Sequence, residues 1–150
     1  MSDWRRIVTA EPENSETPLE RVGSWVTPNR LFFVRSHFPT PTVDAATWRL
    51  HVSGCVERPH DWSLNDLAAL PERTVFATME CAGNGRSFLT PHVHGVQWGA
   101  GAIGHAEWTG VPLRLVLEQA GLKPETQEIL FEGLDRGREA DCPEALQFAR

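Results

Sequence analysis

The sequence predicts one domain of the α+β class, with mixed helices and strands. Three observations predict it. Strand-like alternation occurs in the first half, residues 112–120 have helical periodicity, and no internal repeat or linker divides the 150 residues. Hydrophobic residues make up 41% and charged residues 23%, which is ordinary for a globular protein. The body of the domain is expected at residues 29–150, after a polar, extended lead-in over residues 1–28.

The first half of the chain predicts short strands and one short helix. An apolar run at residues 31–34 is followed by a polar, proline-rich stretch of extended or turn backbone. Residues 48–56 roughly alternate apolar and polar side chains, as a half-buried strand does. Over residues 62–70 the apolar side chains share one helical face, with Ser63 as the candidate N-cap and Pro71 as the stop.

The second half predicts two strands around the best helix of the chain. Residues 73–79 are typical of a strand, and the glycine cluster at residues 95–104 indicates a long irregular loop. Residues 112–120 carry an apolar stripe at helical spacing, and Gly121 suits the position just after the helix. A last strand is expected over residues 129–134.

Charge and cysteine content restrict the partners and the compartment. The net charge of −6 argues against nucleic acid, which needs a basic surface, although a local arginine cluster can still bind a small anion. No apolar run is long enough to span a bilayer. Cys55, Cys81 and Cys142 cannot all pair, which favours a reducing compartment. The cytoplasm is therefore expected. Export to the periplasm through Arg5 and Arg6 is the alternative, although the apolar stretch after them is short for a signal.

The most informative segment is Cys-Ala-Gly-Asn-Gly-Arg at residues 81–86, directly after a predicted strand. Its glycines allow a sharp turn and let a ligand come close to the backbone. Arg86 is placed to bring a permanent cation near the sulfur, and a nearby cation favours the thiolate, the form that binds metals. On spacing alone, Cys81 is either such a ligand or a small buried hydrophobic residue.

Four segments together resemble the sulfite oxidase family, which includes the molybdenum domain of eukaryotic assimilatory nitrate reductase. Residues 78–87 resemble the molybdenum-ligating segment, and residues 33–39 resemble the pterin-contacting segment, usually written F-x-R-N-H-x-P. Residues 98–113 resemble the stretch after the cysteine, and residues 131–135 resemble a later acidic pterin contact. The motifs occur in the family's order and span most of the chain.

The resemblance implies a sulfite oxidase-type molybdopterin-binding fold with Mo-molybdopterin as cofactor. It implies an oxidoreductase that transfers an oxygen atom to sulfite or a similar small oxyanion. No haem-binding domain is seen, so the electrons would leave to an external acceptor such as a cytochrome. The full-length form would be a homodimer. Reduction of nitrate or of a sulfoxide on the same scaffold is the alternative reaction.

The resemblance also implies roles for single residues. Cys81 matches the thiolate ligand of the metal, Arg35 matches a pterin contact that also faces the substrate, and Arg86 and Trp98 match residues around the oxyanion site. Two guanidinium groups suit an oxyanion because their donors match a pair of oxygens. The other matched positions at the pterin are Phe33, Val34, Ser36, His37 and Asp135.

The sequence also departs from the family. Ser36 stands where the family usually has Asn, and Gly85 stands where many eukaryotic members have a second arginine. The family's domain is longer than this chain and is usually followed by a β-sandwich dimerisation domain. The chain is therefore expected to be a partial molybdopterin-binding domain, incomplete at its C-terminus. A truncated, catalytically inactive fragment is the alternative function.

Two other kinds of site are weaker candidates. His92, His94 and His105 follow Cys81 but lack the paired spacing of zinc ligands. Cys81 could also be a covalent nucleophile with one of these histidines as its base. The other two cysteines are expected to be structural or incidental.

Overall fold

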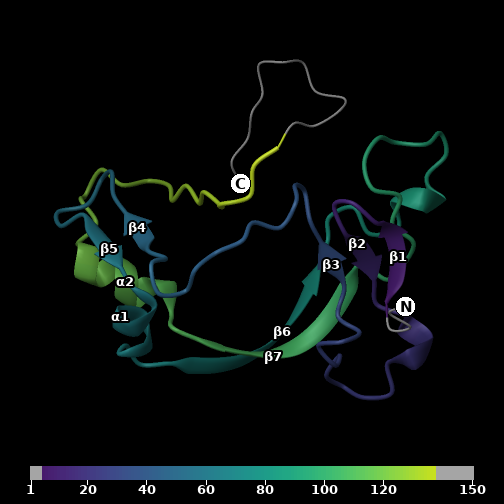
Figure 1. Ribbon diagram of the computed structural model, residues 1–150, viewed down its shortest axis with the longest axis horizontal. Coiled ribbons are helices and arrows are strands. Elements are labelled where there is room, and N and C mark those ends of the chain that lie inside the picture. Colours follow the sequence, from purple (N-terminus) through teal and green to yellow (C-terminus); the bar gives the residue numbers. More distant parts are fainter. Residues whose placement is uncertain (1–4, 138–150) are drawn as a thin grey trace. The chain divides into compact units, whose positions relative to one another are not determined.

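The computed structural model describes residues 5–137, which form two compact units. The first unit is built from three stretches of chain, residues 5–41, 76–108 and 133–137. The second is built from two, residues 42–75 and 109–132. One domain was expected from the sequence, and that expectation stays a prediction. The chain holds both helices and strands, as expected (Figure 1).

A three-stranded antiparallel sheet lies in the first unit, in the order β1 (Arg6–Thr9), β2 (Asn14–Glu16), β3 (Val34–Arg35). A short 3₁₀ helix, η1 (Leu19–Arg21), follows β2. The predicted lead-in over residues 1–28 therefore contains two strands and a helical turn in its described part. All three residues of β2 are buried although they are polar, so hydrophobic patterning gave no sign of this strand.

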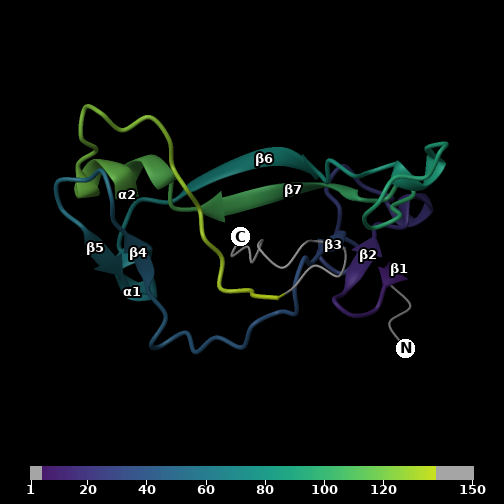
Figure 2. The same cartoon turned by 90° about the horizontal axis from the view of Figure 1, so that it is seen from above.

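The second unit contains the antiparallel pair β4 (Leu50–Val52) and β5 (His60–Trp62), with the helices α1 (Leu64–Ala68) and α2 (Leu113–Ala120) (Figure 2). The helix predicted over 112–120 is confirmed as α2, and Gly121 closes it with a positive φ of 71°. The unit's buried apolar side chains are Val56, Trp62, Val116 and Ala120. No helix within residues 5–137 has the length and apolar character needed to cross a bilayer.

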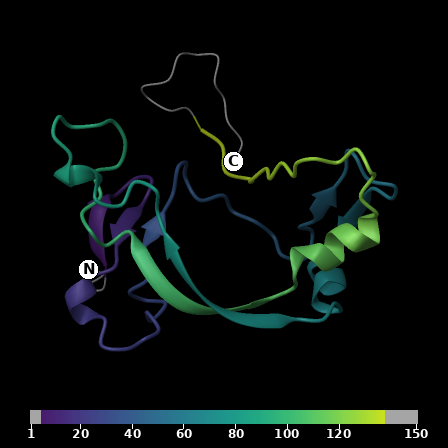
Figure 3. The same ribbon diagram turned by 180° about the vertical axis from the view of Figure 1, so that it is seen from behind.

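Two long strands, β6 (Arg73–Glu80) and β7 (Ile103–Gly110), pair with each other and are visible from both sides in Figures 1 and 3. The strand predicted over 73–79 is confirmed as β6. A loop was expected up to residue 104, because Gly104 indicated irregular backbone. In the structure, β7 already begins at Ile103. A Cβ on Gly104 would lie 2.5 Å from a ring carbon of Phe32, so this glycine lets an aromatic ring pack onto the strand.

The strand expected over residues 129–134 is wrong, because these residues contain neither a helix nor a strand. Apolar β-prone residues form a strand only when a neighbouring strand supplies hydrogen bonds and cross-strand packing. Leu130 is 94% exposed and Phe131 is 66% exposed, so neither has such a neighbour within the described residues.

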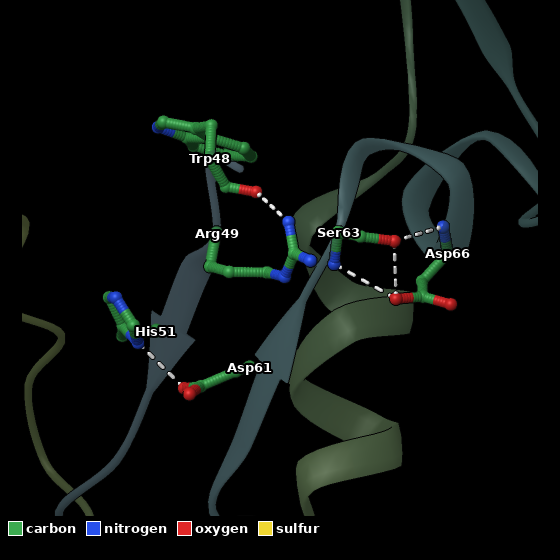
Figure 4. A network of polar contacts seen from close by, with 6 residues as sticks. All are labelled: Trp48, Arg49, His51, Asp61, Ser63 and Asp66. Atoms are coloured by element: carbon green, nitrogen blue, oxygen red, sulfur yellow. Dashed lines mark hydrogen bonds and ion pairs between the residues drawn. The ribbon is translucent and has the colours of Figure 1, made fainter. Parts of the chain in front are cut away.

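The start of α1 is fixed by a reciprocal capping box between Ser63 and Asp66, shown in Figure 4. The Asp66 backbone N–H donates to the Ser63 hydroxyl at 3.1 Å, and the Ser63 backbone N–H donates to the Asp66 carboxylate at 2.9 Å. The predicted N-cap is therefore confirmed, although the helix itself begins at Leu64 and ends at Ala68. Trp62 belongs to β5 rather than to the helix.

Replacing Asp66 with asparagine should destabilise the second unit in a pH-dependent way. The hydrogen bond from the Ser63 side chain, and then that from its backbone, lower the pKa of Asp66. The stabilisation is thus fully present above the ordinary aspartate pKa of about 3.9 and is lost as the pH falls through the lower folded-state pKa. Urea unfolding of Asp66→Asn and wild type should differ most at neutral pH and converge in acid. The exposed Glu72→Gln serves as control, and a pH-independent difference for Asp66→Asn would contradict the expectation.

Candidate active site

Cys81 directly follows β6 and begins a tight turn. Its backbone N–H donates to the Ala102 carbonyl at 2.9 Å, and its carbonyl accepts the Asn84 N–H at 2.9 Å. The thiol is free and half-buried, and it accepts a long hydrogen bond of 3.4 Å from the Gly83 N–H. The backbone of the turn is therefore fixed, while the sulfur is left without a strong partner and partly open to solvent.

The turn is tied to the segment before β7 at several atoms. The Asn84 side chain accepts the Ala102 N–H at 3.0 Å and donates to the Glu80 carboxylate at 2.8 Å. Gly85 has a positive φ of 78°, which favours glycine, and its N–H donates to the Gly99 carbonyl at 2.6 Å. These bonds hold the cysteine-bearing turn against residues 99–102.

The Arg86 guanidinium lies between two glycines and donates to the Val96 carbonyl at 3.1 Å. A Cβ on Gly83 would lie 2.9 Å from Nη2 of Arg86, and a Cβ on Gly95 would overlap Nη1. The Gly83 N–H thus donates to the Cys81 sulfur, and the Arg86 guanidinium occupies the space where a side chain of residue 83 would lie. One glycine therefore contacts both the predicted metal ligand and the predicted cation.

Trp98 links this turn to the first predicted motif. Its side chain is completely buried, and its ring meets the Phe33 ring edge-on with centroids 6.5 Å apart. Its carbonyl accepts the Ser87 N–H at 2.9 Å, which anchors the 3₁₀ helix η2 (Arg86–Phe88). Phe33, Trp98 and Arg86 therefore belong to one connected cluster.

Arg35 lies in a second cluster, around the buried side chain of Asn14. Its guanidinium donates to the Asn14 side-chain oxygen at 3.4 Å, to His37 Nδ1 at 2.9 Å and to the Ser36 carbonyl. The Ser36 N–H donates to the same Asn14 oxygen at 3.0 Å, while Val34 pairs with Ser15 across the sheet. The hydrogen bonds of the described residues do not link Arg35 directly to Cys81 or Arg86.

Asp135 is half-buried and makes no hydrogen bond or ion pair within residues 5–137. Its segment nevertheless lies beside the first motif. A Cβ on Gly137 would come within 2.9 Å of the Phe38 ring carbon Cγ, one residue after His37. Gly137 thus lies beside the predicted pterin-contacting segment, while Asp135 is not hydrogen-bonded to Cys81 or Arg86 in the described part of the chain.

The histidines do not form a site with Cys81. His105 Nδ1 pairs with the Thr78 hydroxyl at 2.9 Å, and no histidine in the described part of the chain hydrogen-bonds to the Cys81 sulfur. Within residues 5–137, no three His, Cys, Asp or Glu side chains form a group that could hold a metal ion. Cys142 lies outside the described residues.

Sequence reasoning missed the residues that support these clusters, chiefly Asn14, Glu16, Asn84 and Ala102. Asn84 lies inside the cysteine motif, so its position in a turn was a usable signal. Asn14 and Glu16 lie in a segment without periodicity, and nothing local in the sequence shows that they are buried.

Comparisons with known proteins find a matching family model and similar sequences. The family model described as "Oxidoreductase molybdopterin binding domain" matches residues 37–149. Mitochondrial sulfite oxidase of Rattus norvegicus is 43% identical over 136 residues, which cover 87% of this chain and 25% of that protein. NADH nitrate reductase of Solanum lycopersicum is 35% identical over 138 residues, covering 87% of this chain and 15% of that protein.

A solved structure with the same fold is that of the sulfane dehydrogenase SoxCD from Paracoccus pantotrophus. The TM-score is 0.77 at 31% sequence identity, over 88% of this chain and 36% of that one. The chain thus spans about a quarter of the rat enzyme and about a third of the SoxCD chain. Because the family model matches well over half of the residues, the chain belongs to the oxidoreductase molybdopterin-binding domain family.

Proposed function

We propose that this chain supplies the protein ligand of a molybdenum cofactor, with Cys81 binding the metal, in an enzyme that oxidises sulfite or a similar small oxyanion. One observation carries the proposal. Cys81 is a free, half-exposed thiol on a hydrogen-bonded turn, and Gly83, which donates to its sulfur, also lies against the Arg86 guanidinium. A thiolate is a soft metal ligand.

The donor set fits a pterin-held metal better than a metal bound by protein alone. Cys81 provides a single sulfur, without a group of further metal-binding side chains in residues 5–137. The residues that would hold the pterin are Phe33, Val34, Arg35, Ser36, His37 and Asp135. When bound, the cofactor supplies two-electron redox chemistry and oxygen-atom transfer.

The two arginines would bind and orient the oxyanion. The guanidinium of Arg86 gives one hydrogen bond to Val96, which fixes its plane and leaves other N–H donors for an anion. Arg35 is exposed, and Asn14 and His37 hold it in place. The Trp98 carbonyl accepts the Ser87 N–H and so anchors the residue that follows Arg86, while the Trp98 ring is completely buried.

The partners and compartment follow from the same proposal. The electrons would pass to an acceptor outside this chain, such as a cytochrome, and the complete enzyme would be a homodimer. The free thiols Cys55 and Cys81 agree with a reducing compartment such as the cytoplasm. Similar proteins named mitochondrial show that the family also works in other compartments.

A second candidate function is an inactive, partial α+β domain that does not hold the cofactor by itself. One observation favours it. All eight residues of β6 are exposed, including Phe76 at 57% and Met79 at 49%. An exposed apolar strand of this kind tends to associate with other surfaces.

Molybdenum analysis of the chain, expressed in a host that makes the cofactor, distinguishes the two candidates. Stoichiometric molybdenum with sulfite-dependent reduction of an electron acceptor is the expected result. A metal-free, self-associating chain would instead support the inactive domain. Parallel assays with nitrate and methionine sulfoxide test the alternative substrates, and turnover of either without turnover of sulfite would overturn the sulfite assignment.

A further inference from the structure

The strand β2 contains a buried charge that the proposed site does not use. Glu16 is 3% exposed, and its carboxylate accepts a hydrogen bond from the Gly99 N–H. Its nearest cation, Arg6, is 3.8 Å away and largely exposed. Burying a carboxylate is costly unless hydrogen bonds and a counter-charge compensate.

Glu16 and Thr17 form hydrogen bonds to the segment of residues 99–103. The Thr17 N–H donates to the Gly101 carbonyl at 2.8 Å, and the Thr17 hydroxyl donates to the Ile103 carbonyl at 2.7 Å. A Cβ on Gly101 would lie 2.8 Å from Cβ of Glu16, so the glycine allows this close approach.

The other side of the same segment holds the cysteine-bearing turn. The Gly99 carbonyl accepts the Gly85 N–H at 2.6 Å, and Ala102 bonds to both Cys81 and Asn84. Hydrogen bonds thus connect β2 to residues 99–103, and they connect residues 99–103 to the turn at residues 81–85. Gly99 is hydrogen-bonded to both elements, because its N–H donates to Glu16 and its carbonyl accepts from Gly85.

We propose that Glu16 is a positioning residue for the Cys81 turn. The inference rests on the proposed function, because it deepens the role of that turn as the metal-binding element. Glycines lose more conformational freedom on ordering than other residues, so a segment with Gly99 and Gly101 needs external partners to hold one conformation. A carboxylate is a stronger acceptor than a neutral group, and here it acts away from water.

Hydrogen–deuterium exchange of the 150-residue chain tests this inference without any cofactor. In Glu16→Ala, exchange at the amides of Cys81, Gly85 and Ala102 should rise roughly tenfold, which corresponds to about 1.4 kcal/mol of local stability. Glu16→Gln keeps an acceptor oxygen and should show a smaller rise. The amides of Glu57 and Lys123, which are hydrogen-bonded in the second unit, serve as the internal reference and should not change.

The matched control is Glu20→Ala, which removes an exposed carboxylate four residues away. Unchanged exchange at the turn in Glu16→Ala would overturn the inference. So would an equal rise at the reference amides, because it would reveal a general loss of stability. If Glu16→Ala does not fold, Glu16→Gln is tested in its place. Unchanged exchange at the turn, or an equal rise at the reference amides, would then overturn the inference.

A second readout separates this inference from the proposed function. In the molybdenum-loaded chain, Glu16→Gln should lower kcat and leave KM for sulfite unchanged, because Glu16 touches no substrate. A raised KM with unchanged kcat would contradict the positioning role. Absence of molybdenum from the wild-type chain would overturn the proposed function, whereas the exchange experiment would still decide the role of Glu16.

Discussion

Cys81→Ser is expected to abolish oxidation of sulfite by the molybdenum-loaded protein, with a loss of more than about 100-fold, while the fold is kept. A serine hydroxyl stays protonated and is a hard donor, so it replaces a soft thiolate poorly. The fold should persist because the hydrogen bonds to Ala102 and Asn84 come from the Cys81 backbone, and from residues 5–137 the sulfur accepts only the long bond from Gly83.

The measurements are molybdenum content, the thiolate-to-metal absorption band and steady-state turnover, each compared with wild type. Cys55→Ser is the matched control, because Cys55 is an exposed free thiol in the second unit, where no proposed ligand lies. The control should keep both metal and activity. Full activity in Cys81→Ser would exclude Cys81 as the ligand, and an unfolded variant would show that the thiol has a structural role.

The parts of the fold that sequence predicted are those whose signals are local. The helix α2 was recognised from its apolar stripe and from Gly121, and β6 was recognised from a run of strand-forming residues. The turn after β6 was recognised from its glycines, and the structure places Arg86 beside the same glycine that contacts the Cys81 sulfur. Each of these features depends on residues within a few positions of one another.

The parts that sequence could not predict depend on distant partners. β2 is built from polar residues, and its burial follows from bonds such as that between Thr17 and Ile103, 86 positions apart. The strand β7, which was not predicted, contains Gly104. A glycine usually indicates a loop, but here the Phe32 ring packs against it within the strand. Conversely, residues 129–134 have strand-forming side chains but no neighbouring strand in the described part of the chain. Local propensity decides secondary structure only where tertiary contacts agree with it.

Arg86→Lys is expected to raise KM for sulfite by about 30-fold, since a charge-assisted hydrogen bond contributes about 2 kcal/mol. Lysine keeps the positive charge but lacks the planar fork that matches two oxygens of an anion. It also cannot fill the space between Gly83 and Gly95 in the same way, because a flat guanidinium lies against both glycines. The loss should therefore appear in substrate binding more than in the retention of molybdenum.

Steady-state kinetics of the molybdenum-loaded variant, together with inhibition by sulfate, measure this effect. Sulfate should inhibit the variant less than wild type, because the same donors would bind both oxyanions. Arg114→Lys is the matched control. Arg114 is an exposed arginine of α2 that pairs with Glu118 at 2.7 Å, and its replacement should leave KM unchanged. If Arg86→Lys has the KM and the sulfate inhibition of wild type, the guanidinium beside Cys81 does not bind the substrate, and its contact with Gly83 serves only to brace the turn.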